Sequence, residues 1–427
     1  MDFATPGYCS WKSYLQSELD MPGEFVESRI KHYKMRREVY AKGGGGEIHI
    51  GIDPDTKLSV AIKRGYSKQR ATYGVNVTLI REIRILQELS LYNHPNIVKL
   101  IEVFPHDGDL YLVEPFYPSY IQQYLTANAT PFNEEQIKYI VFSAAKALLF
   151  LKRCHIIHGD VKPANLLVSR QNTICLTDFG SAIDCGGSTS YSVKQSCIST
   201  VYYNAPEILL GLPEITCSVD VWSLALTWLR LLGVQISPSV LFVCRVDSQN
   251  PTEIQMCQSI FEFLGESPNS DSWPALRHVQ FVPAVTLESL APLQERLRQQ
   301  ISPELVSDEG LSVLCGMLKL DPARRLSIEA ICEHPYFQST IYDAVLRGEF
   351  EGKQYFPALS KLRKNVVVPP LLEDFFGNKK QFEESTLMEE ENSEEEPVAP
   401  KRILRFEGSP MKGGSPMKSG REGVFFW

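Results

Sequence analysis

Four polar residues between positions 160 and 178 have the types and the order that a phosphoryl transfer requires. Asp160, Lys162 and Asn165 lie in the segment His-Gly-Asp-Val-Lys-Pro-Ala-Asn, and Asp178 begins the tripeptide Asp-Phe-Gly. This chemistry needs a carboxylate that orients the attacking hydroxyl, a lysine near the moving phosphate, an amide oxygen on one metal ion and a second carboxylate that bridges metal and phosphates. An isolated Asp or Lys is usually a solvated surface residue, so the inference depends on all four occurring together.

The elements that must position these groups carry two further charges in register with them. Lys63 follows the apolar stretch 58–62, which is typical of a strand. Glu82 lies in 78–86, where apolar residues recur at helical spacing. Glu82 is therefore the natural partner of Lys63.

The whole set of motifs resembles the eukaryotic protein kinases, whose catalytic loop reads His-Arg-Asp-x-Lys-x-x-Asn and whose metal-binding turn reads Asp-Phe-Gly. The resemblance extends from about residue 40 to residue 337. Glu207 matches the end of the Ala-Pro-Glu motif that closes the activation segment, with Arg325 as its buried ion partner, and Asp220 matches the aspartate that anchors the catalytic loop. The resemblance implies an α+β, two-lobed protein kinase fold: an antiparallel β-sheet N-lobe with the family's αC helix, and a mainly α-helical C-lobe.

The same resemblance implies ATP and Mg²⁺ as cofactors and a role for each site residue. The expected catalytic residues are Asp160 as the base, Lys162 on the γ-phosphate, Asn165, Lys63 with Glu82 on the nucleotide, and Thr200 beside Asp160 and Lys162. Magnesium is expected on Asn165 and Asp178. The residues expected at the ATP site are Ala41, Gly43, Gly44, Gly46, Ile48, Ala61, Lys63, Glu114, Phe116, Tyr117, Leu167 and Asp178.

Two departures from the family pattern lie next to these groups. Gly159 stands where the catalytic loop usually has arginine, and Ala41 stands where the glycine-rich loop usually has its first glycine. The glycine run 43–46 either covers the phosphates with its backbone N–H groups or forms only a flexible turn, and its register with Lys63 favours phosphate cover. Two function classes stay open: an active kinase, favoured because every group that touches metal or phosphate is present, and a pseudokinase or scaffold.

Other segments resemble the cyclin-dependent kinases within the CMGC group. These are 78–83 with Asn-His-Pro-Asn-Ile-Val-Lys-Leu at 93–100, and 260–265, which resembles the helical insert of the wider group. In these enzymes the isoleucine that matches Ile80 is buried in a cyclin. Ile80 could equally complete an intramolecular packing face. The pattern thus permits a cyclin partner without requiring one.

The activation segment lacks the groups that usually order it. Cyclin-dependent kinases use a phosphothreonine that three arginines bind through charge-assisted hydrogen bonds. Arg81 keeps one arginine position, but Gly159 and Ile183 occupy the other two, and Gln195 occupies the threonine position. Acceptor and arginines are lost together, which predicts a segment held without phosphate. This combination resembles the fungal single-subunit cyclin-dependent-kinase-activating kinases, which work without a phosphorylated loop or a cyclin.

Two details bear on this narrower resemblance. Ser192 or Ser196 could accept a phosphate in place of the lost threonine, but a lone arginine would hold it weakly. The expected hinge, Glu-Pro-Phe-Tyr at 114–117, shares its Pro-Phe with the fungal group. It places Glu114 at the inner adenine pocket, unless a one-residue shift turns this carboxylate to solvent.

The acceptor class follows from the catalytic loop and from the end of the activation segment. Lys162, two residues after Asp160, resembles the serine/threonine kinases. Proline-directed members carry an arginine just before Ala-Pro-Glu, and Asn204 replaces it here. We therefore expect a serine or threonine without a following proline, such as one in a kinase activation loop, and a cyclin-dependent kinase as the protein substrate.

Composition excludes several other classes. The chain has 427 residues, 44% of them hydrophobic, which is enough to bury two cores. Its 10 cysteines form no Cys-x-x-Cys pair, which indicates reduced thiols in the nucleus or cytoplasm. No basic segment followed by an apolar one begins the chain, and the most apolar region, 219–244, is too interrupted to span a bilayer. A net charge of −8 argues against nucleic acid as a ligand.

The organisation along the chain is expected to be simple. The predicted parts are an N-terminal appendage at 1–29, a kinase domain at 30–337 with N-lobe 30–116 and C-lobe 117–337, a C-terminal extension at 338–382, and a tail at 383–427. The tail is acidic and then basic, and rich in Ser, Gly and Pro. Such sequence cannot bury enough apolar surface to offset its ordering entropy, so we expect disorder there.

Overall fold

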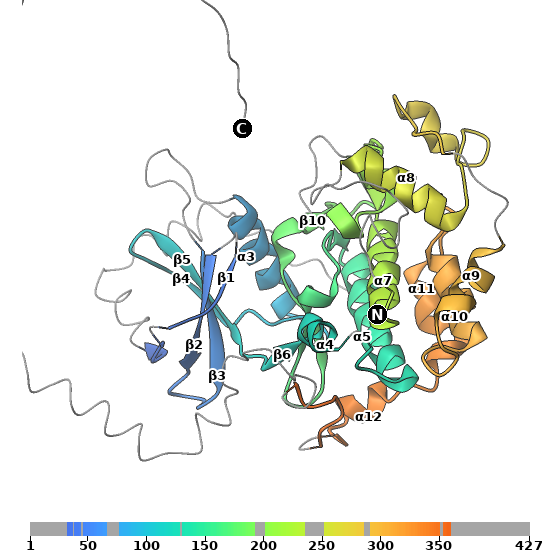
Figure 1. Ribbon diagram of the computed structural model, residues 1–427. Helices are drawn as coiled ribbons and strands as arrows, with labels where there is room; N and C mark the ends of the chain where they lie inside the picture. Colours follow the sequence, from blue (N-terminus) through green and yellow to red (C-terminus); the bar gives the residue numbers. More distant parts are fainter. Residues whose placement is uncertain are drawn as a thin grey trace, which may run out of the picture. The chain divides into compact units, whose positions relative to one another are not determined.

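The computed structural model describes residues 32–36, 38–43, 46–65, 77–128, 130–192, 201–234, 252–285, 291–350 and 353–359. The predicted appendage at 1–29, the predicted tail at 383–427 and the site residues Gly44 and Thr200 lie outside this part. All described residues belong to one compact unit. Within it the predicted α+β architecture is confirmed: an antiparallel sheet with one helix is followed by a mainly helical lobe (Figure 1).

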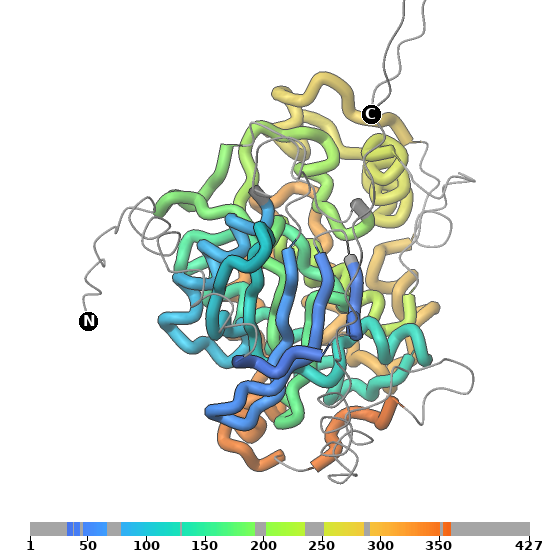
Figure 2. The backbone as a smooth tube through the Cα atoms, turned by 90° about the vertical axis from the view of Figure 1, so that its left-hand side faces the viewer, coloured from blue at the N-terminus to red at the C-terminus, as the bar shows by residue number. Residues whose placement is uncertain are grey.

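The N-terminal lobe is built on a five-stranded antiparallel sheet, whose first three strands lie side by side in Figure 2. Its strands are β1 (Val39–Gly43), β2 (Gly46–Ile52), β3 (Ser59–Gly65), β4 (Glu102–His106) and β5 (Asp109–Pro115), in the order β1-β2-β3-β5-β4. Side chains alternate between the two faces of a strand. Val60 and Ile62, each 1% exposed, therefore pack on one face with Tyr111, and Ala61 and Lys63 point to the other.

Helix α3 (Val77–Ser90) covers the predicted helical segment 78–86 and lies between the sheet and the helical lobe in Figure 1. Leu79, Ile83 and Leu86 are buried, which is the spacing of a single apolar stripe along a helix. The stripe fixes how the helix is turned about its axis, and so decides where its polar residues point.

The C-terminal lobe is mainly helical. Its helices are α4 (Ile121–Ala127), α5 (Glu134–Arg153), α6 (Pro206–Leu209), α7 (Ser218–Leu231), α8 (Glu253–Leu264), α9 (Leu293–Gln300), α10 (Asp308–Met317), α11 (Ile328–Glu333) and α12 (Tyr342–Leu346). The predicted helical segments 136–153 and 311–320 correspond to α5 and α10. Both begin earlier than predicted, because Asn133 and Ser307 accept hydrogen bonds from N–H groups of the first turn.

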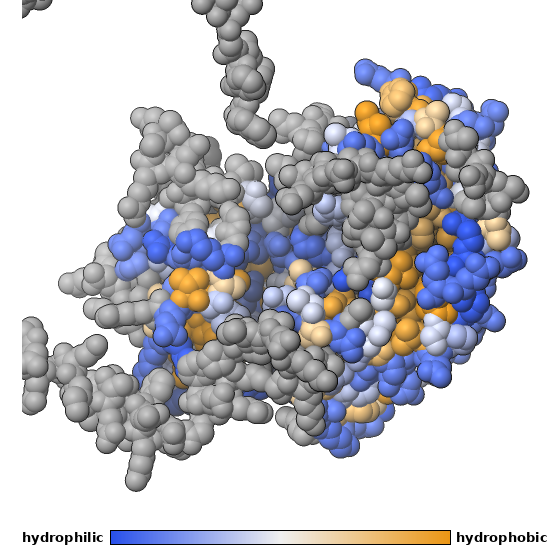
Figure 3. All heavy atoms as spheres, viewed as in Figure 1, coloured by the Kyte–Doolittle hydropathy of each residue, from blue (hydrophilic) through white to orange (hydrophobic). Residues whose placement is uncertain are grey.

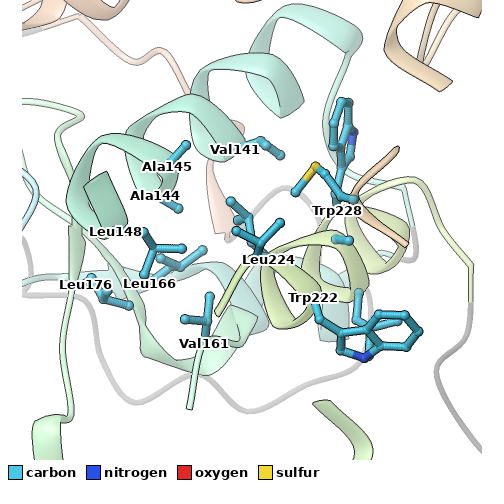
Figure 4. Close-up of a cluster of buried hydrophobic side chains, with 14 of the residues drawn as sticks. Val141, Ala144, Ala145, Leu148, Val161, Leu166, Leu176, Trp222, Leu224 and Trp228 are labelled. Atoms are coloured by element: carbon cyan, nitrogen blue, oxygen red, sulfur yellow. The ribbon is translucent and has the colours of Figure 1, made fainter. Parts of the chain in front are cut away.

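The core of this lobe reaches the catalytic loop directly. Figure 4 shows buried side chains of α5 and α7 gathered against Val161, Leu166 and Leu176, which are at most 1% exposed. Val161 directly follows Asp160, and Leu166 directly follows Asn165. Burial of each apolar neighbour therefore holds the polar residue beside it at the edge of the core.

Short strands organise the chain around the activation segment. They are β6 (Ser119–Tyr120), β7 (Ile156–Ile157), β8 (Leu166–Val168), β9 (Ile174–Leu176), β10 (Ile183–Asp184), β11 (Ser190–Ser192) and β12 (Glu214–Thr216). Strand β10 pairs with β7, and β11 pairs with β12, both antiparallel. Two stretches of the segment are thus held by main-chain hydrogen bonds to the rest of the lobe.

The chain beyond residue 337 packs back on α4 and α5. Phe356 is 4% exposed and lies against the rings of Tyr124 and Phe132, with centroid distances of 6.1 and 5.8 Å. Tyr342 donates a hydrogen bond to the side chain of Asn96, in the turn after α3. The described part of the predicted C-terminal extension therefore completes the core of the lobe.

The described surface carries both hydrophilic and hydrophobic side chains. In the view of Figure 3, hydrophilic side chains cover most of the outer helices at the right, with hydrophobic side chains gathered in a band beside them. Leu91, Tyr92 and Phe281 are among the large apolar residues that are more than half exposed. Among the described helices, none combines the length and the apolar character needed to cross a bilayer.

Candidate functional site

The catalytic loop brings three predicted site residues into contact. Lys162 Nζ lies 2.6 Å from Asp160 Oδ2. Asn165 Nδ2 donates to the backbone oxygen of Asp160 at 2.8 Å and to its Oδ2 at 3.1 Å. Because the amide nitrogen of Asn165 is used in this way, its side-chain oxygen is the atom left to bind a cation.

Asp220, at the start of α7, holds the catalytic loop in place. Its Oδ2 accepts a hydrogen bond from the backbone N–H of His158, and its Oδ1 accepts one from the N–H of Gly159, both at 2.8 Å. The carboxylate is 2% exposed, and burial raises its pKa against the opposing effect of His158 and the two N–H groups. The predicted anchoring role is confirmed.

Gly159 lets the catalytic loop approach the segment after Asp178. Its φ is +76°, a backbone conformation that favours glycine, and a Cβ built there would lie 3.0 Å from the backbone oxygen of Ser181. At the position where the family usually has arginine, the backbone of Gly159 therefore lies close to the backbone of Ser181.

Asp178 is tied to the catalytic loop through its neighbour Thr177, which makes two hydrogen bonds to that loop. It adopts a left-handed conformation, φ 67° and ψ 75°, which is uncommon outside glycine and concentrates at functional sites. The N–H of Thr177 donates to the backbone oxygen of Asn165 at 3.0 Å. The N–H of Asp160 donates to His158 Nδ1, so Nε2 of this histidine carries the hydrogen and donates to Thr177 O at 3.1 Å.

Lys63 and Glu82 form the predicted pair between β3 and α3. Lys63 Nζ lies 2.6 and 2.7 Å from the two carboxylate oxygens of Glu82, which is 3% exposed. Burial alone would lower the pKa of Lys63, but the charges of Glu82, Asp178 and Glu114 outweigh it and hold that pKa above its ordinary value. Lys63 is thus a cation that Glu82 orients, and it also interacts electrostatically with Asp178 and Glu114.

Glu114 points into the interior, so the alternative that turned it to solvent is wrong. It pairs with Ala61 across β5 and β3, and Lys63 pairs with Leu112, which places Glu114 and Lys63 on one face of the sheet. Its Oε1 is buried and has no hydrogen-bond partner in the part of the chain that the structure describes. Burial, and then the charge of Glu82, raises the pKa of Glu114 to about 7, with Lys63 opposing the rise.

The other predicted nucleotide residues lie on neighbouring strands and turns. Ala41 pairs with Ile48 across β1 and β2, and Ile48 pairs with Lys63. Gly43 pairs with Gly46, where a Cβ would lie 1.9 Å from the backbone oxygen of Arg64, so only glycine fits. At the hinge Phe116 packs edge-on against Tyr40, Tyr117 is partly buried, and Leu167 lies in β8. The structure thus gathers Ile48, Ala61, Lys63 and Glu114 on one face of the sheet.

The predicted ion pair between Arg325 and Glu207 is present. Arg325 donates from Nη1 and Nη2 to the two carboxylate oxygens of Glu207, at 2.7 and 2.9 Å. Both side chains are at most 1% exposed. Gln195, at the position of the lost threonine, and the alternative phosphate acceptor Ser196 lie outside the described residues.

One ion pair beside the site was not predicted from the sequence. Arg84 of α3 is bonded to Asp184 of β10, across 100 residues of sequence. The available signal was weak: a basic residue two positions after Glu82, and an acidic one shortly after Asp178. Nothing local in either segment specifies the other as its partner.

The residues present fit a magnesium nucleotide. Carboxylate and amide oxygens of Asp178 and Asn165 are the hard donors that Mg²⁺ prefers. Lys63, oriented by Glu82, would supply positive charge for phosphates. On the same sheet face, Oε1 of Glu114 is buried without a hydrogen-bond partner among the described residues.

Comparison with known proteins agrees with this geometry. A family profile for the protein kinase domain matches residues 36–337. The "Cell division control protein 2 homolog 3" of Trypanosoma brucei brucei is 31% identical over 313 residues, 72% of this chain and 92% of that protein. "Cyclin-dependent kinase D-1" of Arabidopsis thaliana is 31% identical over 314 residues, 71% of each chain. Among solved structures, a yeast RNA Pol II CTD kinase complex aligns with a TM-score of 0.59 at 22% identity, covering 71% of this chain and 93% of that one, a likeness in fold.

Proposed function

We propose that this chain, which belongs to the protein kinase family and to its cyclin-dependent-kinase-like members, transfers the γ-phosphate of ATP to serine or threonine in proteins. The observation that carries the proposal is the arrangement around Asp160. Lys162 and Asn165 both bond its Oδ2, while Glu82 orients Lys63 across the site. A fold kept only to bind partners would not need these charged groups together.

Each side chain has a distinct task in this reaction. Asp160 orients the acceptor hydroxyl and takes its proton, and Lys162 places positive charge where negative charge develops. Lys63, held by Glu82, faces the α- and β-phosphates. ATP with Mg²⁺, which protein kinases generally use, would supply the transferable group and neutralise its oxygens, with Asn165 and Asp178 as the protein ligands.

The proposed substrate is a cyclin-dependent kinase, with a role in the cell cycle or in transcription. Lys162 favours a serine or threonine acceptor. Asn204, which is 7% exposed, stands where proline-directed members carry arginine, so an acceptor without a following proline is favoured. The name of one curated relative, "Cell division control protein 2 homolog 3", refers to cell division, and another is named "Cyclin-dependent kinase D-1". The narrower likeness to fungal activating kinases belongs to the same proposal.

Activity without a phosphorylated activation segment is also proposed. Its support is that main-chain pairing of β10 with β7 and of β11 with β12 holds the described parts of the segment. In addition, Arg81 Nη1 donates to the backbone oxygen of Gly180 at 3.2 Å. A phosphate is one way to order a loop, and backbone pairing is another.

A cyclin is proposed as an optional partner. Ile80 is only partly buried within the chain, so it retains surface that a partner helix could cover. We further propose that the protein acts in the nucleus or cytoplasm without binding nucleic acid or membrane. The domain limits 1–29, 30–337, 338–382 and 383–427 stand as part of this proposal.

The test is transfer of label by the purified full chain. The chain is incubated with magnesium, labelled ATP and an unphosphorylated cyclin-dependent kinase, beside a matched Asp160→Asn variant. Label on the substrate with the unaltered chain alone supports the proposal. Nucleotide binding without transfer would instead favour the pseudokinase, to which Gly159 and Ala41 point, and transfer only after addition of a cyclin would favour a cyclin-bound divergent cyclin-dependent kinase.

A further inference from the structure

We propose that Arg84 and Asp184 are a positioning pair that holds α3 against the start of the activation segment, in place of the arginine-bound phosphate of other cyclin-dependent kinases. The inference rests on the proposed function, because it explains how the site stays assembled without a phosphorylated segment. It concerns two residues outside the nucleotide and metal groups described above.

One face of α3 is turned towards the activation segment. Arg81 donates to Gly180 O at 3.2 Å, and Arg84 is bonded to Asp184. Thr78, one turn before Arg81 on α3, also approaches the segment. A Cβ added to Gly180 would lie 2.9 Å from the side chain of Thr78. Residues three apart lie on the same side of a helix, so Thr78, Arg81 and Arg84 form one contact row.

Asp184 is itself held firmly. It lies in β10, where it pairs with Ile156 of β7. Its Oδ1 accepts a hydrogen bond from the backbone N–H of Gly186 at 2.8 Å, which leaves Oδ2 to receive Arg84 Nη2. The carboxylate is therefore oriented towards the helix by its own strand and turn, so less conformational freedom is lost when the ion pair forms.

Arg84 also acts on a second acid, Glu88. Burial, and then the charge of Asp184, raises the pKa of Glu88, while Arg84 opposes that rise. Glu88 lies one turn further along α3, so it is a helical neighbour of Arg84. Loss of Arg84 removes an attraction and leaves Asp184 and Glu88 to repel each other, whereas loss of Asp184 removes only the attraction. Neutralising Arg84 is therefore expected to cost more activity than neutralising Asp184.

Within the described part of the chain, two of the three positions that would bind a phosphate carry no charge, and the third, Arg81, also contacts the activation segment directly. Gly159 has no side chain and packs on Ser181 O, and Ile183 is apolar and partly buried. Arg81 is engaged with Gly180 O. The link between helix and segment thus runs through Arg84, three residues along from Arg81.

The pair acts on the reaction through Glu82. Arg84 is two residues beyond Glu82 on the same helix, and Glu82 is bonded to Lys63. Movement of α3 away from the segment would stretch that bond and turn Lys63 away from the nucleotide. The expected effect is consequently on kcat and on the KM for ATP, and not on the KM for the protein substrate.

The experiment is a charge exchange in the full chain, expressed in bacteria and treated with phosphatase. The variants are Arg84→Gln, Asp184→Asn and the double exchange Arg84→Glu with Asp184→Arg, and the control is Arg347→Gln, which breaks an exposed ion pair with Glu349. Because a partly exposed ion pair contributes modestly, we expect each single change to lower kcat/KM for ATP by about fivefold. The value for Arg84→Gln should be lower than the value for Asp184→Asn. The double exchange should restore kcat/KM for ATP to about half of the value of the unaltered chain.

The outcomes separate this inference from the function on which it rests. If the unaltered chain transfers no phosphate after phosphatase treatment, the proposed function without a phosphorylated segment is wrong, whatever the variants do. If the unaltered chain is active, single variants equal to Arg347→Gln overturn the positioning pair. A double exchange no better than the worse single variant does the same, because a merely structural role for each residue would not be rescued by reversing both charges.

Discussion

The guanidinium of Arg325 and the carboxylate of Glu207 form a bidentate ion pair in which neither side chain is more than 1% exposed. Arg325 also donates to the backbone oxygens of Ser218, Lys319 and Leu320. Each donor is thereby satisfied by an acceptor, as a buried charge requires. The pair joins the end of the activation segment to the loop before α11.

Removing one partner of this pair should destabilise the C-terminal lobe strongly. Arg325→Ala leaves Glu207 as a buried charge without a partner, so we expect the free energy of unfolding to fall by about 3–5 kcal/mol. Urea denaturation followed by tryptophan fluorescence measures it. The double variant Arg325→Met with Glu207→Leu should lose less than Arg325→Ala alone, since it leaves no unpaired charge. An Arg325→Ala variant as stable as the unaltered chain would contradict the prediction.

Asp160→Asn should abolish activity without unfolding the protein. The amide keeps the shape of the side chain but cannot take the proton of the acceptor hydroxyl, so a loss of roughly a hundredfold or more in kcat is expected. Labelled-phosphate transfer measures kcat, and thermal unfolding shows whether the fold is kept. Asp107→Asn, in the exposed turn between β4 and β5, is the matched control and should leave kcat unchanged. Undiminished turnover in Asp160→Asn would reject the role of this carboxylate.

Glu114→Gln should change how stability depends on pH. Burial raises the pKa of Glu114 from 4.5 to about 7, so the folded state prefers its protonated form. That contribution is fully present below pH 4.5 and is lost as the pH rises through about 7. Glutamine does not titrate, so the variant should gain stability relative to the unaltered chain between pH 5 and pH 8, by up to about 3 kcal/mol.

The measurement is the free energy of unfolding of both proteins at pH 5 and pH 8. The matched control for the substitution itself is Glu349→Gln, at an exposed position. A difference for Glu114→Gln that is the same at both pH values would show that this carboxyl is ionised throughout the range.

Phe356→Ala should destabilise the helical lobe although it lies outside the segment with kinase motifs. Its ring is 4% exposed among aromatic side chains of α4 and α5, so its removal leaves a cavity and should cost about 3–5 kcal/mol. Thermal or urea unfolding checks this. Phe281→Ala, at a ring that is 60% exposed, is the control and should change stability by less than about 0.5 kcal/mol. Equal effects of the two substitutions would mean that the extension contributes nothing to the core.

The sequence by itself determined the family, the two-lobed fold and the candidate site residues that the structure brings together. Asp160, Lys162, Asn165 and Asp178 are identified by chemistry at short, fixed spacing, and such spacing along one chain is written in the sequence. The periodicity of apolar residues located β3, α3 and α5 for the same reason. The first residues of α5 and α10 differ from the predicted ones, because the capping side chains of Asn133 and Ser307 set where these helices begin.

Only the tertiary structure decided the long-range partners. The direction of Glu114 depends on the register between β3 and β5, because a shift of one residue would turn its side chain to the other face of the sheet. The pairing of Arg84 with Asp184 depends on the angle at which α3 meets β10, and the burial of Phe356 on the path of the chain after residue 337. Register, helix placement and chain path are set by the packing of the whole core, and no local pattern of residues specifies them.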